Sequence, residues 1–418
     1  MMRKIGADGP SDAVSLRNPP GALVVGGDHP GLGIARSLGS RGIPVVVLDD
    51  QYSVSSFSRY VCKVVRVPDL RDERKSIDAI MDIGRHLELA NWVLFPTRDE
   101  TVTAVSRHRD ELSSIFRLTT PDWSTAQWAC NKKNTYELAT RLGIPCPQTF
   151  NPRTLEELRA LESRLPLAIK PAVKENFFYA TGAKAWRADN AQQLQALFCR
   201  AADRIIPEEI LVQEIIPGDG GHQFSYCAFF KDGQAMGSLV ASRMRQHPRE
   251  FGRAATYVET AAVPAVEELA TRFLKAINYY GLVEIEFKHD ARDDQYKLID
   301  VNARTWGFHS LGAAAGVDFP FMAYADQLGE TVRPCRGETG VGWLRMVTDI
   351  PTALGDLMLG HLSVSAYFRS LRRTRVESVF CGRDPLPSIG ELILLPYLVA
   401  KRMFSRSGDE HPAHEGSY

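Results

Sequence analysis

Two alternating stretches late in the chain carry carboxylates at a spacing that could hold a cation. Residues 281–290 and 296–304 each alternate apolar and polar side chains, which is typical of half-buried strands. The segment between them is polar and rich in Asp, so the pair predicts a β-hairpin whose turn centres near Asp293. Such a hairpin brings polar side chains of both strands onto one face.

The expected register of this hairpin creates an acidic cluster. Glu286 lies opposite Asp300 and Glu284 opposite Asn302, and opposed Cβ atoms are about 4.5–5.5 Å apart. Because like charges destabilise a sheet, we expect a cation there, and Mg²⁺ carrying nucleotide phosphates is the commonest hard cation of this kind. A solvated acidic face is the alternative, but Asn302 and Arg304 beside the acids favour the cation site.

Two upstream lysines could supply positive charge to phosphates. Lys132 lies near the start of a helix predicted over 131–143, where a cation opposes the helix dipole unless an anion binds. Lys170 ends an apolar strand predicted over 166–171, and phosphate is a suitable partner for such a point charge. Taken singly, either lysine is more often an ordinary surface residue.

A further strand, predicted over 210–218, has features of an adenine site. Glu214 precedes its Pro-Gly exit and could accept a hydrogen bond from an exocyclic amine, while neighbouring backbone groups read the rest of the base. Asp219 follows and could reach a ribose hydroxyl, although turn chemistry alone also explains it.

The N-terminal residues predict a doubly wound α/β domain. Short apolar strands over 22–25 and 44–49 flank a glycine-containing turn at 26–33 and a helix. A nicotinamide site with Asp49 on a ribose is one interpretation, but the order GGxxxGxG does not match GxGxxG, so we favour a domain without nicotinamide. The polar cluster 95–100 follows another strand, and it predicts either a ligand-binding edge or a helix cap.

Composition and length set the broad class. The chain has 418 residues, of which 44% are hydrophobic and 24% charged, so we expect two or three ordinary globular domains. Fifty basic residues balance fifty acidic ones, which gives no global field toward nucleic acid or membrane.

Seven dispersed cysteines without metal spacing favour reduced thiols and a cytoplasmic location. The apolar run 392–400 is short and contains Pro396, so we expect a packed terminal helix and no integral membrane segment, with membrane-surface contact as the alternative.

Taken together, these motifs resemble the ATP-grasp superfamily, most closely its ATP-dependent carboxylate–amine ligases, from about residue 21 to about residue 330. The matching elements are 131–143, 169–171, 212–218, and Glu286 paired with 300–304. The resemblance implies an α/β and α+β multidomain chain. Its expected parts are a flexible tail (1–20), a doubly wound pre-ATP-grasp domain (21–125), two ATP-grasp lobes (126–205 and 206–332) and a mostly helical C-terminal extension (333–418).

The resemblance also implies roles for individual residues. ATP would contact Lys132, Lys170, Lys184, Gln213, Glu214, Ile216 and Asp219. Mg²⁺ would be held by Glu286, Asp300 and Asn302, and Arg304 would stabilise the transferred phosphoryl group. The family loop after the second lysine is usually rich in glycine, whereas 172–184 contains only Gly182, and Lys174 and Lys184 could supply charge instead.

Substrate residues are expected on two further segments. Arg243 and Arg245 belong to a segment with four arginines and could clamp a carboxylate or an acyl phosphate, with a solvated basic loop as an equal alternative. Trp306, Phe308 and His309 follow the second hairpin strand and are candidates for the acceptor pocket, although a histidine there is more often structural.

The implied activity is a ligase that uses ATP and Mg²⁺ as cofactors. It would activate a carboxylate as an acyl phosphate and join it to an amine, forming a C–N bond. The expected partners are small-molecule carboxylate and amine substrates, without nucleic acid, and a homodimer is compatible with the sequence. The alternatives are a nicotinamide-dependent oxidoreductase and an ATP-binding regulator without catalysis, the second suggested by the glycine-poor loop.

Overall fold

The N-terminal part is a doubly wound domain, as the sequence predicts. The computed structural model describes residues 20–173, 181, 183–248, 252 and 254–407. A parallel sheet in the order β3-β2-β1-β4-β5 comprises β1 (Ala22–Val25), β2 (Val45–Asp49), β3 (Lys63–Arg66), β4 (Val93–Pro96) and β5 (Arg117–Leu118). Around it lie α1 (His29–Gly39), η1 (Val54–Phe57), α2 (Glu73–His86), α3 (Asp99–Arg107) and α4 (Arg109–Ser113).

Alternation along these strands explains the two helical layers. Val24 and Val47 pack with α1 in one hydrophobic core, whereas Leu23 and Val46 pack with α2 and α3 in another. A strand buried on both faces is typical of a parallel sheet covered by helices on both sides. The carboxyl ends of β1 and β4 form the edge at which open α/β sheets commonly bind ligands.

A small antiparallel sheet forms the next layer. Its order is β6-β9-β7-β8, with β6 (Thr149–Phe150), β7 (Leu167–Pro171), β8 (Trp186–Ala188) and β9 (Ile210–Glu214). One face is covered by α7 (Leu155–Arg159) and α9 (Ala191–Ala202), and η2 (Glu162–Arg164) and η3 (Pro207–Glu209) connect its elements. Helices α5 (Trp123–Cys130) and α6 (Lys132–Arg141) lead into it from the N-terminal domain.

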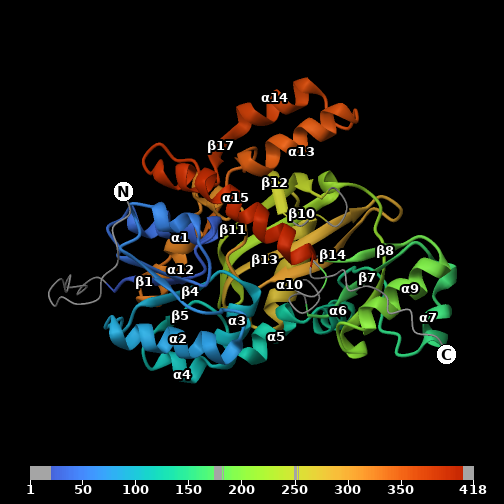
Figure 1. Ribbon diagram of the computed structural model, residues 1–418, viewed down its shortest axis with the longest axis horizontal. Coiled ribbons are helices and arrows are strands. Elements are labelled where there is room, and N and C mark those ends of the chain that lie inside the picture. The colour runs from blue at the N-terminus through green and yellow to red at the C-terminus, as the bar shows by residue number, and fades with distance from the viewer. Residues whose placement is uncertain (1–19, 174–180, 182, 249–251, 253, 408–418) are drawn as a thin grey trace.

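The largest sheet has the order β14-β13-β10-β11-β12-β16-β17. It comprises β10 (Gln223–Lys231), β11 (Gln234–His247), β12 (Ala254–Ala261), β13 (Gly281–Asp290), β14 (Gln295–Asn302), β16 (Gly342–Leu344) and β17 (Thr374–Glu377), while β15 (Cys335–Arg336) pairs with β11. Short η4 (Gly220–His222), α10 (Pro264–Ala276), α11 (Ser310–Ala314) and α12 (Phe319–Gln327) complete this part. Figure 1 shows the sheet between the N-terminal domain and the small sheet.

The predicted hairpin and its register are confirmed. Strands β13 and β14 are antiparallel, with Glu284 opposite Asn302 and Glu286 opposite Asp300. A register irregularity between Glu286 and Phe287 lies directly beside these pairs, and such bulges redirect side chains near active sites.

The C-terminal residues form α13 (Met346–Met358), α14 (Val364–Arg373) and α15 (Leu386–Ser407), and strands β15 to β17 join the largest sheet. The expected boundary near residue 333 therefore falls within one sheet, and β9, beyond the boundary expected near 205, pairs in the small sheet. In Figure 1, α15 crosses the molecule while α13 and α14 project from it. Among the described residues, no helix is long and apolar enough to cross a membrane.

Candidate active site between the two antiparallel sheets

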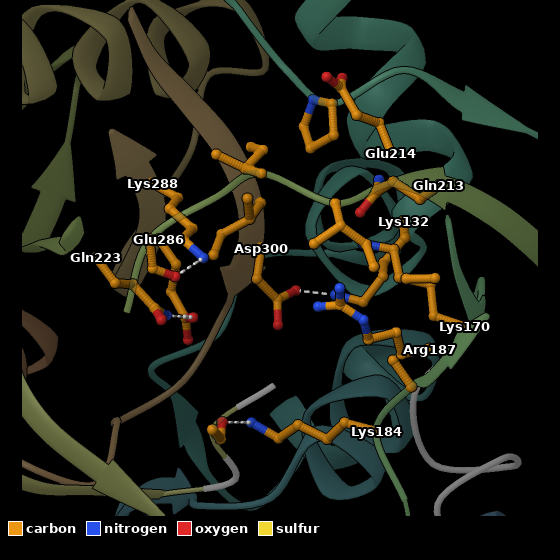
Figure 2. A pocket seen from close by; sticks show the side chains of 18 of the residues that line it. Lys132, Lys170, Lys184, Arg187, Gln213, Glu214, Gln223, Glu286, Lys288 and Asp300 are labelled. Atoms are coloured by element: carbon orange, nitrogen blue, oxygen red, sulfur yellow. Dashed lines mark hydrogen bonds and ion pairs between the residues drawn. The ribbon is translucent and has the colours of Figure 1, made fainter. Parts of the chain in front are cut away.

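A pocket lies between the small sheet and the β13–β14 hairpin. Its charged lining combines five basic and three acidic side chains, namely Lys132, Lys170, Lys184, Arg187, Lys288, Glu214, Glu286 and Asp300. Apolar walls come from Ala168, Ile216, Pro217 and Ile299. Figure 2 shows Glu286 and Asp300 on one side of the pocket and Lys132, Lys170 and Arg187 on the other. An apolar slot beside concentrated positive charge suits a planar base attached to phosphates.

The acidic hairpin face carries a cation from the protein itself. The Arg243 guanidinium reaches from β11 to Glu284 Oε1 at 2.9 Å and Glu286 Oε1 at 2.5 Å. Asn302 Nδ2 donates to the same two carboxylates at 3.0 and 3.1 Å. Ser225 Oγ donates to Glu284, and Gln223 Nε2 donates to Glu286. These contacts explain how two neighbouring carboxylates of β13 remain stable on one face.

Burial sets the titration of this cluster. Glu284 is 3% exposed, and burial raises its pKa although Arg243 opposes the shift. For Arg243, burial lowers the pKa, but the Glu286 and Glu284 carboxylates outweigh it and the net shift is upward. Arg243 therefore stays protonated between the two acids.

Lys132 contacts the other predicted metal ligand. Asn131 caps α6 by accepting a hydrogen bond from the Lys133 backbone at 2.9 Å, which starts the helix at Lys132. The Lys132 ammonium pairs with the Asp300 carboxylate in the centre of the pocket, as Figure 2 shows. A lysine predicted to bind phosphate and an aspartate predicted to bind metal thus meet in one place.

The other two predicted phosphate lysines also line the pocket. Lys170 Nζ donates to the Tyr136 hydroxyl at 2.6 Å, and Tyr136 donates in turn to the Ile299 carbonyl at 2.7 Å. Burial raises the pKa of Tyr136, so this hydroxyl stays protonated. Lys184 Nζ donates to the Gly252 carbonyl at 3.0 Å. The rest of the glycine-poor loop, including Lys174, lies largely outside the described residues.

The sequence reasoning missed two basic residues of the pocket. Lys288 shares the face of Glu284 and Glu286 by strand alternation, so the same pattern could have found it. Arg187 lies opposite Ala168 between β8 and β7, and no sequence signal marked it.

The predicted adenine strand borders the pocket, but its glutamate side chain is engaged elsewhere. Glu214 accepts hydrogen bonds from the Gln148 backbone at 3.1 Å and from Arg292 at 2.5 Å. Gln213 Nε2 donates to Thr149 Oγ1 at 2.6 Å. The Glu214 carboxylate is therefore already held by an ion pair with Arg292, and both Glu214 and Ile216 line the pocket.

Asp219 lies outside the pocket lining. Its carboxylate caps η4 by accepting from the Gly221 backbone at 3.0 Å, and it contacts His222 Nδ1 at 3.0 Å. The structure therefore places it in the turn role that the sequence left as the alternative.

The expected clamp of Arg243 and Arg245 is wrong for Arg245. Its guanidinium binds Asp349 of α13 through two contacts of 2.8 and 2.9 Å and also donates to Ser370. In a regular strand, side chains two residues apart point to the same face. Strand β11 has register irregularities on both sides of Arg245, so Arg243 and Arg245 do not follow this rule. Arg243 therefore serves the hairpin acids, while Arg245 anchors the C-terminal helices.

Arg304 joins the hairpin to the N-terminal domain. Its guanidinium makes a two-pronged contact with the Asp99 carboxylate, at 2.6 and 2.9 Å, and lies 3.4 Å from Asn302 Oδ1. Burial lowers the pKa of Arg304, but Asp99 outweighs it and the net shift is upward. Asp99 belongs to the polar cluster after β4, so that cluster contacts the hairpin at the carboxyl end of β4.

The three residues after the hairpin do not line the pocket. Trp306 and Phe308 are 1% and 2% exposed and pack in the hydrophobic core shared with the N-terminal domain. His309 lies against Gly33 of α1, and burial lowers its pKa to about 4. The acceptor-pocket prediction is therefore corrected for Trp306 and Phe308, which close the core between the domains, whereas His309 borders a separate pocket beside α1.

Asp49 is not available to a ribose. It is 1% exposed, accepts a hydrogen bond from the Gly27 backbone at 2.7 Å, and pairs with Arg98 at 2.7 Å. The turn that suggested nicotinamide is therefore closed by contacts within the domain, which removes the main support for the oxidoreductase interpretation.

The hairpin acids fit Mg²⁺ bound together with phosphates. Glu286 and Asp300 oppose one another and both line the pocket. Asn302, the third predicted metal ligand, lies outside the pocket lining and donates a hydrogen bond to Glu284. Within the described ranges, no group of three or more His, Cys, Asp or Glu side chains is arranged to hold a metal by itself. Mg²⁺ commonly takes one or two carboxylates and completes its shell with water and substrate phosphates, so two carboxylates suffice.

The sequence is similar to that of a known ligase. No protein-family model matches the sequence. The D-aspartate ligase of Enterococcus faecium is 24% identical over 302 residues, which are 68% of this chain and 70% of that protein.

Solved structures cover most of the chain. The biotin carboxylase domain of the Hydrogenobacter thermophilus 2-oxoglutarate carboxylase has a TM-score of 0.61 at 15% identity, covering 77% of this chain and 73% of that one. The L-amino acid ligase of Bacillus licheniformis has 0.57 at 15%, covering 76% and 78%. The N5-carboxyaminoimidazole synthetase of Staphylococcus aureus with ADP has 0.59 at 13%, covering 77% and 80%. These identities establish the fold. The chain therefore shares the fold of these ATP-grasp structures, and its sequence is similar to that of a D-aspartate ligase.

Proposed function

We propose that this protein is an ATP-dependent ligase that activates a carboxylate as an acyl phosphate and joins it to an amine. The observation that carries the proposal is the contact between Lys132 and Asp300 inside a pocket rich in basic residues. It brings a cation that would bind phosphate and a carboxylate that would bind Mg²⁺ into one site. ATP and Mg²⁺ are the proposed cofactors, and a small-molecule carboxylate and amine are the proposed substrates.

The basic, acidic and apolar residues of the pocket would each bind a different part of Mg²⁺-bound ATP. Lys132 and Lys170 would hold phosphate oxygens, while Ile216 and Ile299 would enclose the base between apolar walls. Glu286 and Asp300 would hold Mg²⁺, with Asn302 fixing the Glu286 carboxylate from behind. Bound Mg²⁺ would neutralise charge on the phosphate oxygens. Catalysis then rests mainly on positioning and electrostatic stabilisation.

The bonds formed and broken follow from this assignment. A carboxylate oxygen attacks the γ-phosphorus, and the bond to the leaving ADP breaks. The amine then attacks the acyl carbon, and phosphate leaves as the C–N bond forms. Arg304 lies beside Asn302 at the junction with the N-terminal domain, where its charge would stabilise the transferred phosphoryl group.

A turnover assay with pooled substrates tests the proposal. The protein is incubated with ATP, Mg²⁺ and pools of amino and carboxylic acids, and we expect ADP and phosphate only when a matching pair is present. Glu286→Gln and Asp300→Asn should abolish this turnover while the fold survives, as measured by circular dichroism. The Asp78→Asn variant is the control, because Asp78 is an exposed residue of α2 outside the pocket lining.

Two outcomes would favour the other interpretations. Tight ATP binding without turnover on any pool would favour the regulator. Binding of NADH without binding of ATP would contradict the ligase and support the oxidoreductase. A cytoplasmic location and a homodimer stay predictions, which fractionation and light scattering would test.

A further inference from the structure

The helical hairpin formed by α13 and α14 exposes apolar side chains in a stripe. In α13, Met346, Ile350, Leu354 and Met358 recur every four residues and so lie on one side of the helix. Their exposure increases along the helix and reaches 87% at Met358. Leu359, Val364 and Phe368 continue the exposed apolar set through the turn and along α14. Single exposed apolar residues are ordinary, but a contiguous set marks an interaction surface.

The opposite side of this hairpin is fixed to the body of the protein. Asp349 of α13 is buried and accepts hydrogen bonds from Arg245 of β11 and Thr256 of β12. Ser370 of α14 accepts a third hydrogen bond from Arg245. Figure 1 shows the two helices projecting at the top of the molecule, above the largest sheet. The buried ion pair therefore anchors one side and leaves the apolar stripe presented to the outside.

The charge of the segment indicates the partner. Residues 357–376 contain four arginines and no Asp or Glu, in a chain whose formal net charge is zero. Arg373 and Arg375 pair with Glu259 and Glu338. In the described part of the chain, exposed Arg369 and Arg372 make no ion pair with any acid, and Arg372 follows Phe368 by four residues. The stripe therefore passes from apolar to basic side chains.

This combination fits an anionic lipid surface better than a second copy of the chain. A symmetric dimer buries the same patch against itself, so it would bring the arginines of both copies together. Helices with Leu, Met and Phe on one side and arginine at the edge instead lie in the interface of anionic membranes. We propose that the α13–α14 hairpin docks this protein peripherally on anionic lipid bilayers.

A vesicle sedimentation assay tests this docking. The full-length protein is mixed with vesicles of phosphatidylcholine alone or of phosphatidylcholine with phosphatidylglycerol. We expect binding to the anionic vesicles to be stronger by about tenfold or more, because each arginine near the surface adds attraction. The double variant Leu354→Glu, Met358→Glu should lose this binding. Ile206→Glu is the matched control, since Ile206 is 57% exposed and Leu354 55%, and Ile206 lies before η3, away from the hairpin.

A second variant separates charge from apolar contact. Arg369→Gln with Arg372→Gln should reduce the preference for anionic vesicles and leave the melting temperature unchanged. Equal sedimentation of the wild type and the Leu354→Glu, Met358→Glu variant would overturn the proposal, as would no binding to anionic vesicles. A dimer in light scattering that these two substitutions dissociate, without vesicle binding, would overturn it in favour of self-association.

Discussion

Replacing Arg243 and Arg245 separately distinguishes the site from the scaffold. Both residues are 6% exposed, both belong to β11, and both neutralise buried carboxylates. Arg243 contacts the hairpin acids Glu284 and Glu286, whereas Arg245 contacts Asp349 of α13. The variants Arg243→Met and Arg245→Met remove the same chemical group two residues apart.

The expected stability losses follow from uncompensated buried charge. Removing one partner of a buried ion pair costs about 3–5 kcal/mol, so both variants should lose stability in that range at neutral pH. For Arg243→Met the loss should shrink as pH falls. Burial raises the pKa of Glu284 in the folded protein above its unfolded value, so protonation of Glu284 stabilises the fold. This stabilisation is fully present below the unfolded pKa and is lost as the pH rises through the folded pKa.

Function should separate the two variants. We expect Arg243→Met to weaken Mg²⁺-dependent ATP binding, because Glu286 loses the charged one of the contacts that position its carboxylate. Arg245→Met should keep ATP affinity close to that of the wild type. Urea unfolding measures the stability and titration calorimetry measures the affinity. Equal loss of ATP binding in both variants, or an unchanged stability of Arg243→Met, would refute this reasoning.

Three further predictions concern residues around the site. Asp99→Asn should lower turnover by about 10- to 100-fold with little change in ATP affinity, because Arg304 loses the carboxylate that orients it. Steady-state kinetics measure the turnover and calorimetry the affinity, and an unchanged kcat would contradict this prediction. His309 has a folded pKa of about 4, so its neutral form stabilises the protein fully above its unfolded pKa and less as pH falls toward 4. His309→Asn should remove about 3 kcal/mol of this acid sensitivity in pH-dependent unfolding, and an unaltered pH profile would argue against it. Asp219→Ala should cost about 1 kcal/mol of stability as a lost cap and leave ATP affinity intact, whereas a large affinity loss would restore its ribose role.

The alternation of apolar and polar residues was sufficient to predict the β13–β14 hairpin and its register. Strand alternation and an Asp-rich turn fix which residues oppose one another, and the pairs Glu286–Asp300 and Glu284–Asn302 follow. The doubly wound domain and the helix start at Lys132 follow from similarly local signals.

Contacts between segments far apart in the sequence could not be predicted from the sequence pattern. The cation expected between the hairpin acids is partly supplied by Arg243, which reaches them across β10. Arg245 leaves the site because irregularities in β11 break the alternation. Glu214 is captured by Arg292 of the hairpin turn. Each case depends on which side chains of separate segments come into contact in the folded protein. The alternation of residues along a single strand does not predict those contacts.

The most direct test of the central claim is capture of the activated carboxylate. Hydroxylamine replaces the amine in a reaction with ATP, Mg²⁺ and pooled carboxylic acids, and the products are measured by mass spectrometry. We predict a hydroxamate that forms together with ADP in the wild type and is absent in Asp300→Asn, whose carboxylate faces Lys132 in the pocket. Hydroxamate formation without ATP, or its persistence in Asp300→Asn, would contradict carboxylate activation at this site.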